Sequence, residues 1–175
     1  ALVLIDDAAR LIRRVNRVAA TAAPAGLAVN LVEELRVLEP FLRHLADGVG
    51  LDVVYPVSSA WIHMDPTELR QVLTNLVSNA CDATENDGII TIRLYTKRPD
   101  AGPQQPTGMW WCLDVTDSGH GMPADVLARV FEPYFTTKGE TGTGIGLTTV
   151  SEIVARYGGT IAATSEPGRG STFTV

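Results

Sequence analysis

The chain has 175 residues, 45% hydrophobic and 19% charged, which suits one folded domain with a real core and excludes a disordered composition. Twenty acidic against fourteen basic residues give a net charge of −6, which argues against a nucleic-acid domain that works through a basic field. The sequence has no apolar run long enough to span a bilayer, and Cys81 and Cys112 fit no zinc pattern. We therefore expect a cytoplasmic domain with two reduced thiols.

The first predicted element is a helix over residues 1–20. Its apolar residues recur at alternating steps of four and three and form one seam, made of Leu4, Ala8, Leu11, Val15 and Val18. Such a seam requires a partner in this chain or in a second copy, although an ordinary amphipathic helix packed on its own domain explains it equally well. Residues 21–26 break the pattern and are predicted to be a linker.

A second helical pattern runs from Leu31 to Leu45, with Pro40 inside it, where we expect a kink or a restart. A short strand is expected over residues 51–55. The tetrapeptide Asp65-Pro66-Thr67-Glu68 then offers an N-cap, a proline at the first helical position and an acid at the third. It predicts a helix that begins there and ends near residues 86–88.

The rest of the chain alternates between strands and helices. Strands are expected over residues 89–95 and 110–115, around a proline- and glycine-rich loop, and again over 160–165 and 171–175. Helices are expected over 123–131 and 147–157, with a glycine- and threonine-rich loop before the second. Because no βαβ rhythm is visible, we predict an α+β fold, in which helices cover one face of a mixed, mainly antiparallel sheet.

Three polar residues follow one edge of the helix that begins after Asp65. Asn75, Asn79 and Asp82 are spaced four and three apart, so they lie beside the apolar stripe of that helix. An amide carbonyl can ligate Mg²⁺ next to phosphate oxygens without adding charge, which gives these residues a chemical purpose. Alternatively, the asparagines face water or satisfy nearby backbone groups.

A glycine-containing turn, residues 117–123, follows an apolar strand. Gly119 and Gly121 let the backbone turn sharply and approach a flat ligand. Asp117 could accept a hydrogen bond from an exocyclic amine, and Met122 offers an apolar contact. An ordinary strand-to-helix turn is the alternative interpretation.

A second glycine motif, Gly142-Thr143-Gly144-Ile145-Gly146-Leu147, leads directly into a helix. Its exposed N–H groups and the positive end of the helix dipole suit a phosphate, although it is neither a P-loop nor a Rossmann motif. Lys138 could add a point charge on the same phosphates, or could be a solvated surface lysine. The aromatic residues of the preceding segment, 131–138, are expected to be core anchors.

Taken in order, these motifs resemble the ATP-binding catalytic domain of sensor histidine kinases. That domain is part of the Bergerat-type superfamily, which also includes gyrase, MutL-like proteins and heat-shock chaperones. The resemblance covers residues 51–175, and the stretch FEPYFTTKGETGTGIGL looks like kinases with a short ATP lid. It implies a two-layer Bergerat-type sandwich, with ATP and Mg²⁺ as cofactors. Residues 1–23 would be the end of a dimerisation helix with its linker, and residues 24–175 the ATP-binding catalytic domain.

The resemblance also assigns roles. Asn79 would ligate Mg²⁺, Asn75 would lie near the phosphates and Lys138 would contact them, so these three are the expected catalytic residues. Asp117 would bind adenine, and Ser171 or Thr172 would close the far side of its pocket. The expected nucleotide site comprises Asn75, Asn79, Asp82, Asp117, Gly119, Gly121, Met122, Phe135, Lys138, Thr143, Gly144, Ile145, Gly146, Leu147 and Thr172.

One position bears on the reaction. Superfamily members that hydrolyse ATP generally carry a glutamate where this sequence has Asn75, and an amide cannot take a proton at neutral pH. The resemblance therefore implies transfer of the γ-phosphoryl group to a histidine on a dimerisation-helix domain, within a two-component sensor histidine kinase. An anti-sigma-type serine/threonine kinase and a nucleotide-binding pseudokinase are the alternatives.

The expected partners follow from the same resemblance. None of the three histidines stands in the H-[ED] context of a phosphoacceptor, so the acceptor is expected upstream of this chain. A response regulator receiver domain would be the next partner. The full-length protein is expected to be a homodimer, with this domain in the cytoplasm.

Overall fold

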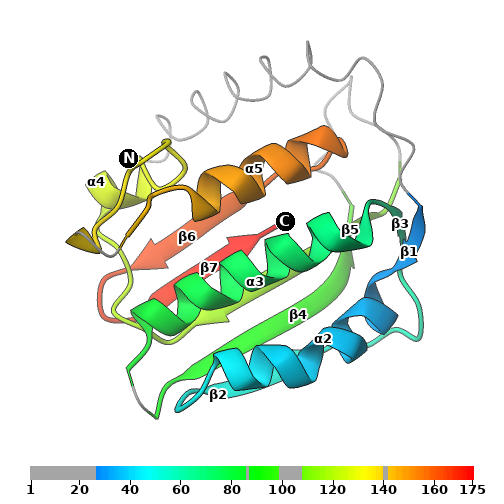
Figure 1. The fold of residues 1–175 in the computed structure, drawn as a ribbon, viewed down its shortest axis with the longest axis horizontal. Coiled ribbons are helices and arrows are strands. Elements are labelled where there is room, and N and C mark those ends of the chain that lie inside the picture. Colours follow the sequence, from blue (N-terminus) through cyan, green and yellow to red (C-terminus); the bar gives the residue numbers. More distant parts are fainter. Residues whose placement is uncertain (1–26, 86, 99–107, 140–141) are drawn as a thin grey trace.

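The computed structural model describes residues 27–85, 87–98, 108–139 and 142–175 (Figure 1). The helical seam and linker expected before residue 27 lie outside the described residues, and so does the boundary expected between residues 23 and 24. Among the described residues, no helix is both long and apolar enough to cross a membrane.

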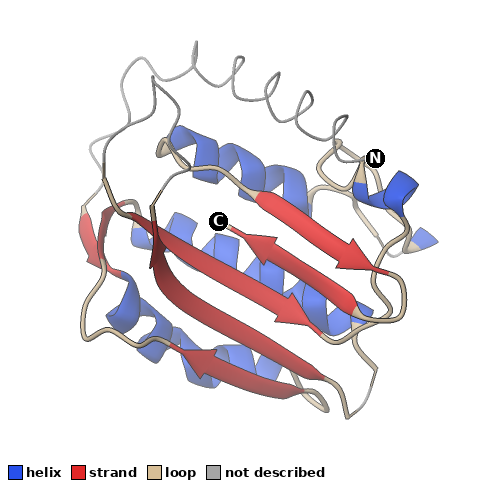
Figure 2. Cartoon of the chain, turned by 180° about the vertical axis from the view of Figure 1, so that it is seen from behind, coloured by secondary structure: helices blue, strands red, loops and turns tan. Residues whose placement is uncertain are grey.

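A five-stranded sheet forms the centre of the fold (Figure 2). In spatial order its strands are β2 (Gly50–Val54), β4 (Ile89–Lys97), β5 (Trp110–Asp117), β7 (Gly170–Thr174) and β6 (Ala162–Glu166). β2 pairs with β4 in parallel, and the other neighbours pair in antiparallel fashion. The expected mixed, mainly antiparallel sheet is confirmed, with strand ends within two residues of their predicted positions.

Three helices cover one face of this sheet: α2 (Leu31–Leu45), α3 (Pro66–Ala83) and α5 (Gly146–Arg156) (Figure 1). The core lies between the two layers, where alternate residues of β4, namely Ile90, Ile92 and Leu94, are fully buried. The same alternation turns the intervening residues of β4 to the other face of the sheet.

The connection from β2 to β4 differs from the expectation. It passes through α3 and joins two parallel neighbours, so the fold contains one βαβ crossover, although none was expected. The βαβ unit is hard to recognise in the sequence because a strand of a second, small sheet lies between β2 and α3. The strands of this small sheet, β1 (Ala28–Asn30) and β3 (Trp61–His63), pair in antiparallel fashion and are too short to show an alternating pattern.

The helix ends follow the capping signals more closely than the apolar pattern. Asp65 caps α3 as predicted, because its Oδ1 accepts hydrogen bonds from the N–H groups of Thr67 (2.7 Å) and Glu68 (3.4 Å). α2 continues through Pro40, so the expected restart does not occur. α3 ends at Ala83, before residues 86–88, and the helix expected over 123–131 is reduced to α4 (Ala124–Leu127).

A polar clamp holds the end of α5 against the start of α3. The Tyr157 hydroxyl donates to Glu68 Oε2 (2.6 Å) and accepts from the backbone N–H of Asp65 (3.1 Å). Arg156 forms an ion pair with the same glutamate. The hydrogen bond to Glu68 is the main reason that the pKa of Tyr157 is raised. Since the two helices run antiparallel, this clamp joins them at one end, while the middle of α3 meets the start of α5 at the other.

We expect Tyr157→Phe to lower the free energy of unfolding by about 0.5–1 kcal/mol, because it removes two hydrogen bonds at a partly exposed position. Urea denaturation measures this change. Tyr134→Phe is the matched control, since the Tyr134 side chain is 77% exposed and its substitution should leave the transition unchanged. Equal unfolding midpoints for the two variants would contradict the clamp.

Candidate functional site

A cavity of about 370 Å³ opens between α3, the start of α5, the turn after β5 and the segment that precedes α5. Most of the residues predicted for a nucleotide site line it: Asn75, Asn79, Asp82, Asp117, Met122, Phe135, Lys138, Thr143, Gly144, Gly146 and Leu147. The structure therefore brings together residues that lie up to 72 positions apart in the sequence, from Asn75 to Leu147.

One end of the cavity is formed by a buried carboxylate. Asp117 is only 3% exposed, and its Oδ1 accepts hydrogen bonds from the backbone N–H groups of Gly119 (2.9 Å) and Ser171 (3.2 Å). Burial raises the pKa of Asp117, although these two hydrogen bonds and the nearby His120 act in the opposite direction. Both of these backbone hydrogen bonds reach Oδ1, so Oδ2 remains able to accept one from a ligand.

The two glycines of the turn after Asp117 shape this end of the cavity without lining it. A Cβ atom on Gly119 would lie 2.1 Å from the carbonyl oxygen of Ala83, and Gly121 has a positive φ of 63° and meets Glu166 equally closely. Only glycine allows such an approach to the end of α3 and to the β6–β7 hairpin. The N–H of Met122 donates to Ser165 Oγ (2.7 Å), which fastens the turn to β6.

The prediction for Thr172 requires a correction. Thr172 lies on the opposite face of the sheet, where its hydroxyl is 3.0 Å from that of Thr116 on the neighbouring strand. Ser171, one position earlier, lines the cavity and donates its N–H to Asp117. Because successive strand residues face opposite sides, the register of β7 decides between the two, and the sequence alone does not give that register.

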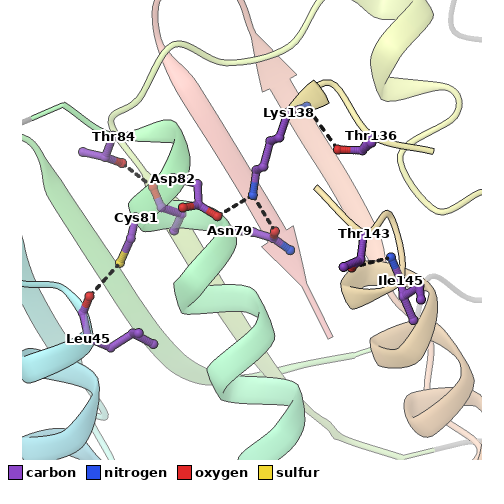
Figure 3. Close-up of polar contacts among 10 residues, drawn as sticks. Leu45, Asn79, Cys81, Asp82, Thr84, Thr136, Lys138, Thr143 and Ile145 are labelled. Atoms are coloured by element: carbon purple, nitrogen blue, oxygen red, sulfur yellow. Dashed lines mark hydrogen bonds and ion pairs between the residues drawn. The ribbon is translucent and has the colours of Figure 1, made fainter. Parts of the chain in front are cut away.

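The other end of the cavity is polar and combines α3 with the segment before α5. Lys138 Nζ donates to Asn79 Oδ1 (3.1 Å) and pairs with Asp82 Oδ2 (2.5 Å) (Figure 3). Asn75 Nδ2 donates to the carbonyl oxygen of Gly146 at the start of α5 (3.4 Å). The edge of α3 that the spacing predicted therefore faces both the lysine and the second glycine motif.

The first turn of α5 is suited to an anion. Gly146 and Leu147 line the cavity, and the N-cap residue Ile145 makes no side-chain hydrogen bond to the helix, so the first N–H groups of α5 have no side-chain cap. Ile145 itself does not line the cavity and is 47% exposed. Gly144, with φ of 64°, accepts a hydrogen bond from the N–H of Tyr134 (2.9 Å) and so fixes the approach to the helix.

The aromatic residues of segment 131–138 behave differently from one another. Phe131 packs edge-on against Phe173 at 6.3 Å and anchors the segment to the core, as predicted. Phe135 lines the cavity beneath the guanidinium of Arg129, which lies 4.2 Å from its ring centroid. Tyr134 is exposed, so its prediction as a core anchor is wrong.

Several lining residues were missed from the sequence: Ser78, Ala83, His120, Val126, Val130, Thr136, Thr137 and Phe173. Ser78 carries a signal that could have been used, since it lies three positions after Asn75 and four before Asp82 on the same helix. The apolar members carry no such signal, because their spacing is that of ordinary core residues.

The donor set at the polar end fits Mg²⁺. The Asn79 carbonyl oxygen and the Asp82 carboxylate are hard oxygen ligands, and they already lie around one positive charge, the Lys138 ammonium. Within the described parts of the chain, no group of three or more His, Cys, Asp or Glu side chains could hold a metal ion by itself. A cation bound here would therefore complete its coordination with further oxygens, from water or from a phosphorylated ligand.

A two-layer sandwich, with a buried carboxylate at one end of its cavity and an uncapped helix start at the other, defines a nucleotide-binding domain. Residues 64–175 match the family model described as histidine kinase-, DNA gyrase B-, and HSP90-like ATPase, and the chain belongs to this family. It is an ATP-binding domain of that family.

Among curated proteins, the sensor histidine kinase ZraS of Escherichia coli (strain K12) is 36% identical over 180 residues, which cover 100% of this chain and 36% of ZraS. The sensory histidine kinase/phosphatase NtrB of Rhodobacter capsulatus is 38% identical over 111 residues, covering 60% of this chain and 30% of NtrB. The chain thus spans about a third of the length of these relatives.

Solved structures agree with this placement. The catalytic domain of histidine kinase ThkA superposes with a TM-score of 0.65 at 29% identity, covering 85% of this chain and 93% of that one. Full-length ShkA, solved in complex with AMPPNP, gives a TM-score of 0.65 at 28% identity, covering 94% of this chain and 35% of ShkA. The predicted fold class is confirmed.

We expect Asp117→Asn to abolish ATP binding while leaving the fold as stable as before, or more so, at pH 7. The amide oxygen keeps the hydrogen bonds from Gly119 and Ser171, and the cost of burying a charge disappears. As the pH falls toward about 4, the wild-type carboxyl takes up a proton, so the stability difference should close. Calorimetric titration and urea denaturation at several pH values measure both effects. Retained ATP affinity would refute the assignment.

Two alanine substitutions in the second glycine motif should have opposite effects on stability. A Cβ on Gly146 would make only ordinary contacts, 3.8–3.9 Å from Asn79 and Asn75, whereas one on Gly144 would lie 2.4 Å from the Tyr134 backbone. Gly146→Ala should therefore preserve or slightly raise the melting temperature but weaken nucleotide binding, by narrowing the space between the asparagines and α5. Gly144→Ala should lower the melting temperature. The opposite order of melting temperatures would contradict this geometry.

Proposed function

We propose that this chain is the catalytic domain of a sensor histidine kinase, and that it binds Mg-ATP and transfers the γ-phosphoryl group to a histidine on a dimerisation-helix domain. The observation that carries the proposal is the arrangement around α3. One edge of this helix presents two amides and a carboxylate to Lys138 and to the start of α5, while Asp117 lies at the other end of the same cavity.

The Asp117 end would hold adenine. Oδ1 is occupied by two backbone N–H groups, so Oδ2 would accept a hydrogen bond from the exocyclic amine. Met122 and Phe173 line the same cavity and would offer apolar contacts to the base. A partly desolvated carboxylate strengthens such a hydrogen bond, because water competes less for it.

The phosphates would lie between α3 and the start of α5. Asn79, with Asp82 beside it, would hold Mg²⁺, which when bound neutralises charge on the phosphate oxygens. The N–H groups of the first turn of α5 would bind phosphate oxygens directly, and Lys138 would add a point charge. Asn75 would lie beside the γ-phosphate, and its hydrogen bond to the Gly146 carbonyl oxygen would keep α3 close to the start of α5.

The described lining residues offer positioning, but no carboxylate among them is placed to activate water at the phosphate end. Among the described lining residues, the carboxylates are Asp82, which pairs with Lys138, and Asp117, which is buried at the adenine end. Asn75 presents an amide and cannot accept a proton at neutral pH. The residues present are therefore suited to hold ATP in line with a separate nucleophile, rather than to hydrolyse it.

The nucleophile would come from outside the described residues. His44 is exposed on α2, His63 lies in β3, and His120 lines the cavity with its Nδ1 2.7 Å from the Gly121 carbonyl oxygen. None stands in an H-[ED] context, so the acceptor histidine would belong to a dimerisation-helix domain of the full-length homodimer. A receiver domain would then take the phosphoryl group, with this domain facing the cytoplasm. The relatives ZraS and NtrB are sensor histidine kinases, which supports this scheme.

The test is calorimetric titration with ATP, with and without Mg²⁺, followed by transfer from labelled ATP to a separately supplied dimerisation-helix domain of the parent protein. We expect binding with negligible hydrolysis, and acid-labile phosphate on the added domain. Asn79→Ala should bind ATP with an affinity that no longer responds to Mg²⁺, and should lose transfer. Tight binding of Mg-ATP without transfer to any histidine would overturn the proposal.

A further inference from the structure

We propose that Lys138 competes with the divalent cation for Asn79 and Asp82, so that its ammonium holds the cation position in the nucleotide-free protein and is released toward the phosphates when the metal–nucleotide complex binds. This inference rests on the proposed function. It gives Lys138 two successive partners, the polar edge of α3 and then the phosphates, in place of one.

The contacts of the Lys138 side chain are specific. Lys138 Nζ donates to the side-chain oxygen of Asn79 (3.1 Å), the atom that would ligate Mg²⁺, and it lies 2.5 Å from the carboxylate of Asp82, one turn further along α3 (Figure 3). The backbone of the lysine is also held, because its N–H donates to Thr136 Oγ1 (3.1 Å). The backbone hydrogen bond to Thr136 thus helps to position the Lys138 ammonium beside Asn79 and Asp82.

An ammonium and a divalent cation cannot share these oxygens. Both would need the carbonyl oxygen of Asn79, and two positive charges in contact with the same carboxylate repel each other. A cation that reaches Asn79 must therefore displace Lys138. The displaced side chain would remain in the same cavity as phosphates bound at the start of α5, since Lys138, Asn79 and Gly146 all line it.

If Lys138 competes with the cation, its removal should affect cation binding and ATP binding in opposite directions. A bare divalent cation meets only the competing ammonium, so removal of the lysine should strengthen its binding. ATP meets the same lysine as a favourable charge, so removal should weaken its binding. A lysine that served only to stabilise the fold would change neither affinity, and one that only contacted phosphate would change the second alone.

The experiment measures binding of Mn²⁺ alone to the nucleotide-free 175-residue chain, by electron paramagnetic resonance of the free ion, and binding of Mg-ATP by calorimetry. The variants are Lys138→Gln, Asp82→Asn and the double variant. Lys97→Gln, at the end of β4, is the matched control because it changes the net charge equally and Lys97 does not line the cavity. Circular dichroism confirms that each variant is folded.

We expect Lys138→Gln to bind Mn²⁺ roughly two- to fivefold more tightly than the wild type, the range set by the loss of a partly exposed ion pair, and to bind Mg-ATP more weakly. The gain for Mn²⁺ should be smaller in the Asp82→Asn background, where the ammonium keeps only its hydrogen bond to Asn79. Equal Mn²⁺ affinity in the wild type and Lys138→Gln, an equal gain in Lys97→Gln, or an undiminished gain without Asp82 would overturn the inference. Failure of the wild type to bind Mg-ATP would instead overturn the proposed function.

Discussion

The antiparallel contact between α3 and α5 is the constraint on which the rest of this structure depends. One side of α3 packs into the core through residues such as Leu73 and Leu76, and its adjacent edge faces α5. The clamp of Tyr157 on Glu68 and Asp65 fixes one end of this pair of helices. At the other end, the first turn of α5 lies opposite the two asparagines. The phosphate end of the cavity is thus bounded by a pair of helices that is also joined about two turns away from it.

Where a local rule decides the structure, the sequence predicted it well. The cap at Asp65 follows from a side chain and a backbone two residues apart, and helical spacing alone places Asn75, Asn79 and Asp82 on one edge. Neither depends on any distant residue. The glycines of the two motifs could also be identified, because the approach of backbone to backbone leaves no room for a Cβ atom, as at Gly119.

Where a feature depends on a partner far away in the sequence, it was not predicted or was predicted wrongly. Ser171 and Thr172 have similar chemistry, and only the pairing of β7 with β5 selects the serine for the cavity. The parallel pairing of β2 with β4 depends on a crossover that the short strand β3 interrupts. The contact of Lys138 with Asp82 joins residues 56 positions apart, and nothing in the spacing of either one indicates it.

The buried carboxylate of Asp117 links the fold to the supply of its ligand. Burial keeps this carboxylate away from water, and the loss of hydration lowers the stability of the folded domain. A ligand that binds the folded state and not the unfolded chain adds its binding free energy to stability, in proportion to the logarithm of its concentration. A copy of the domain weakened by a core substitution would therefore persist in a cell rich in nucleotide and be degraded in a starved one. The amount of the protein in the cell would then report the nucleotide concentration, more slowly than occupancy of the cavity does.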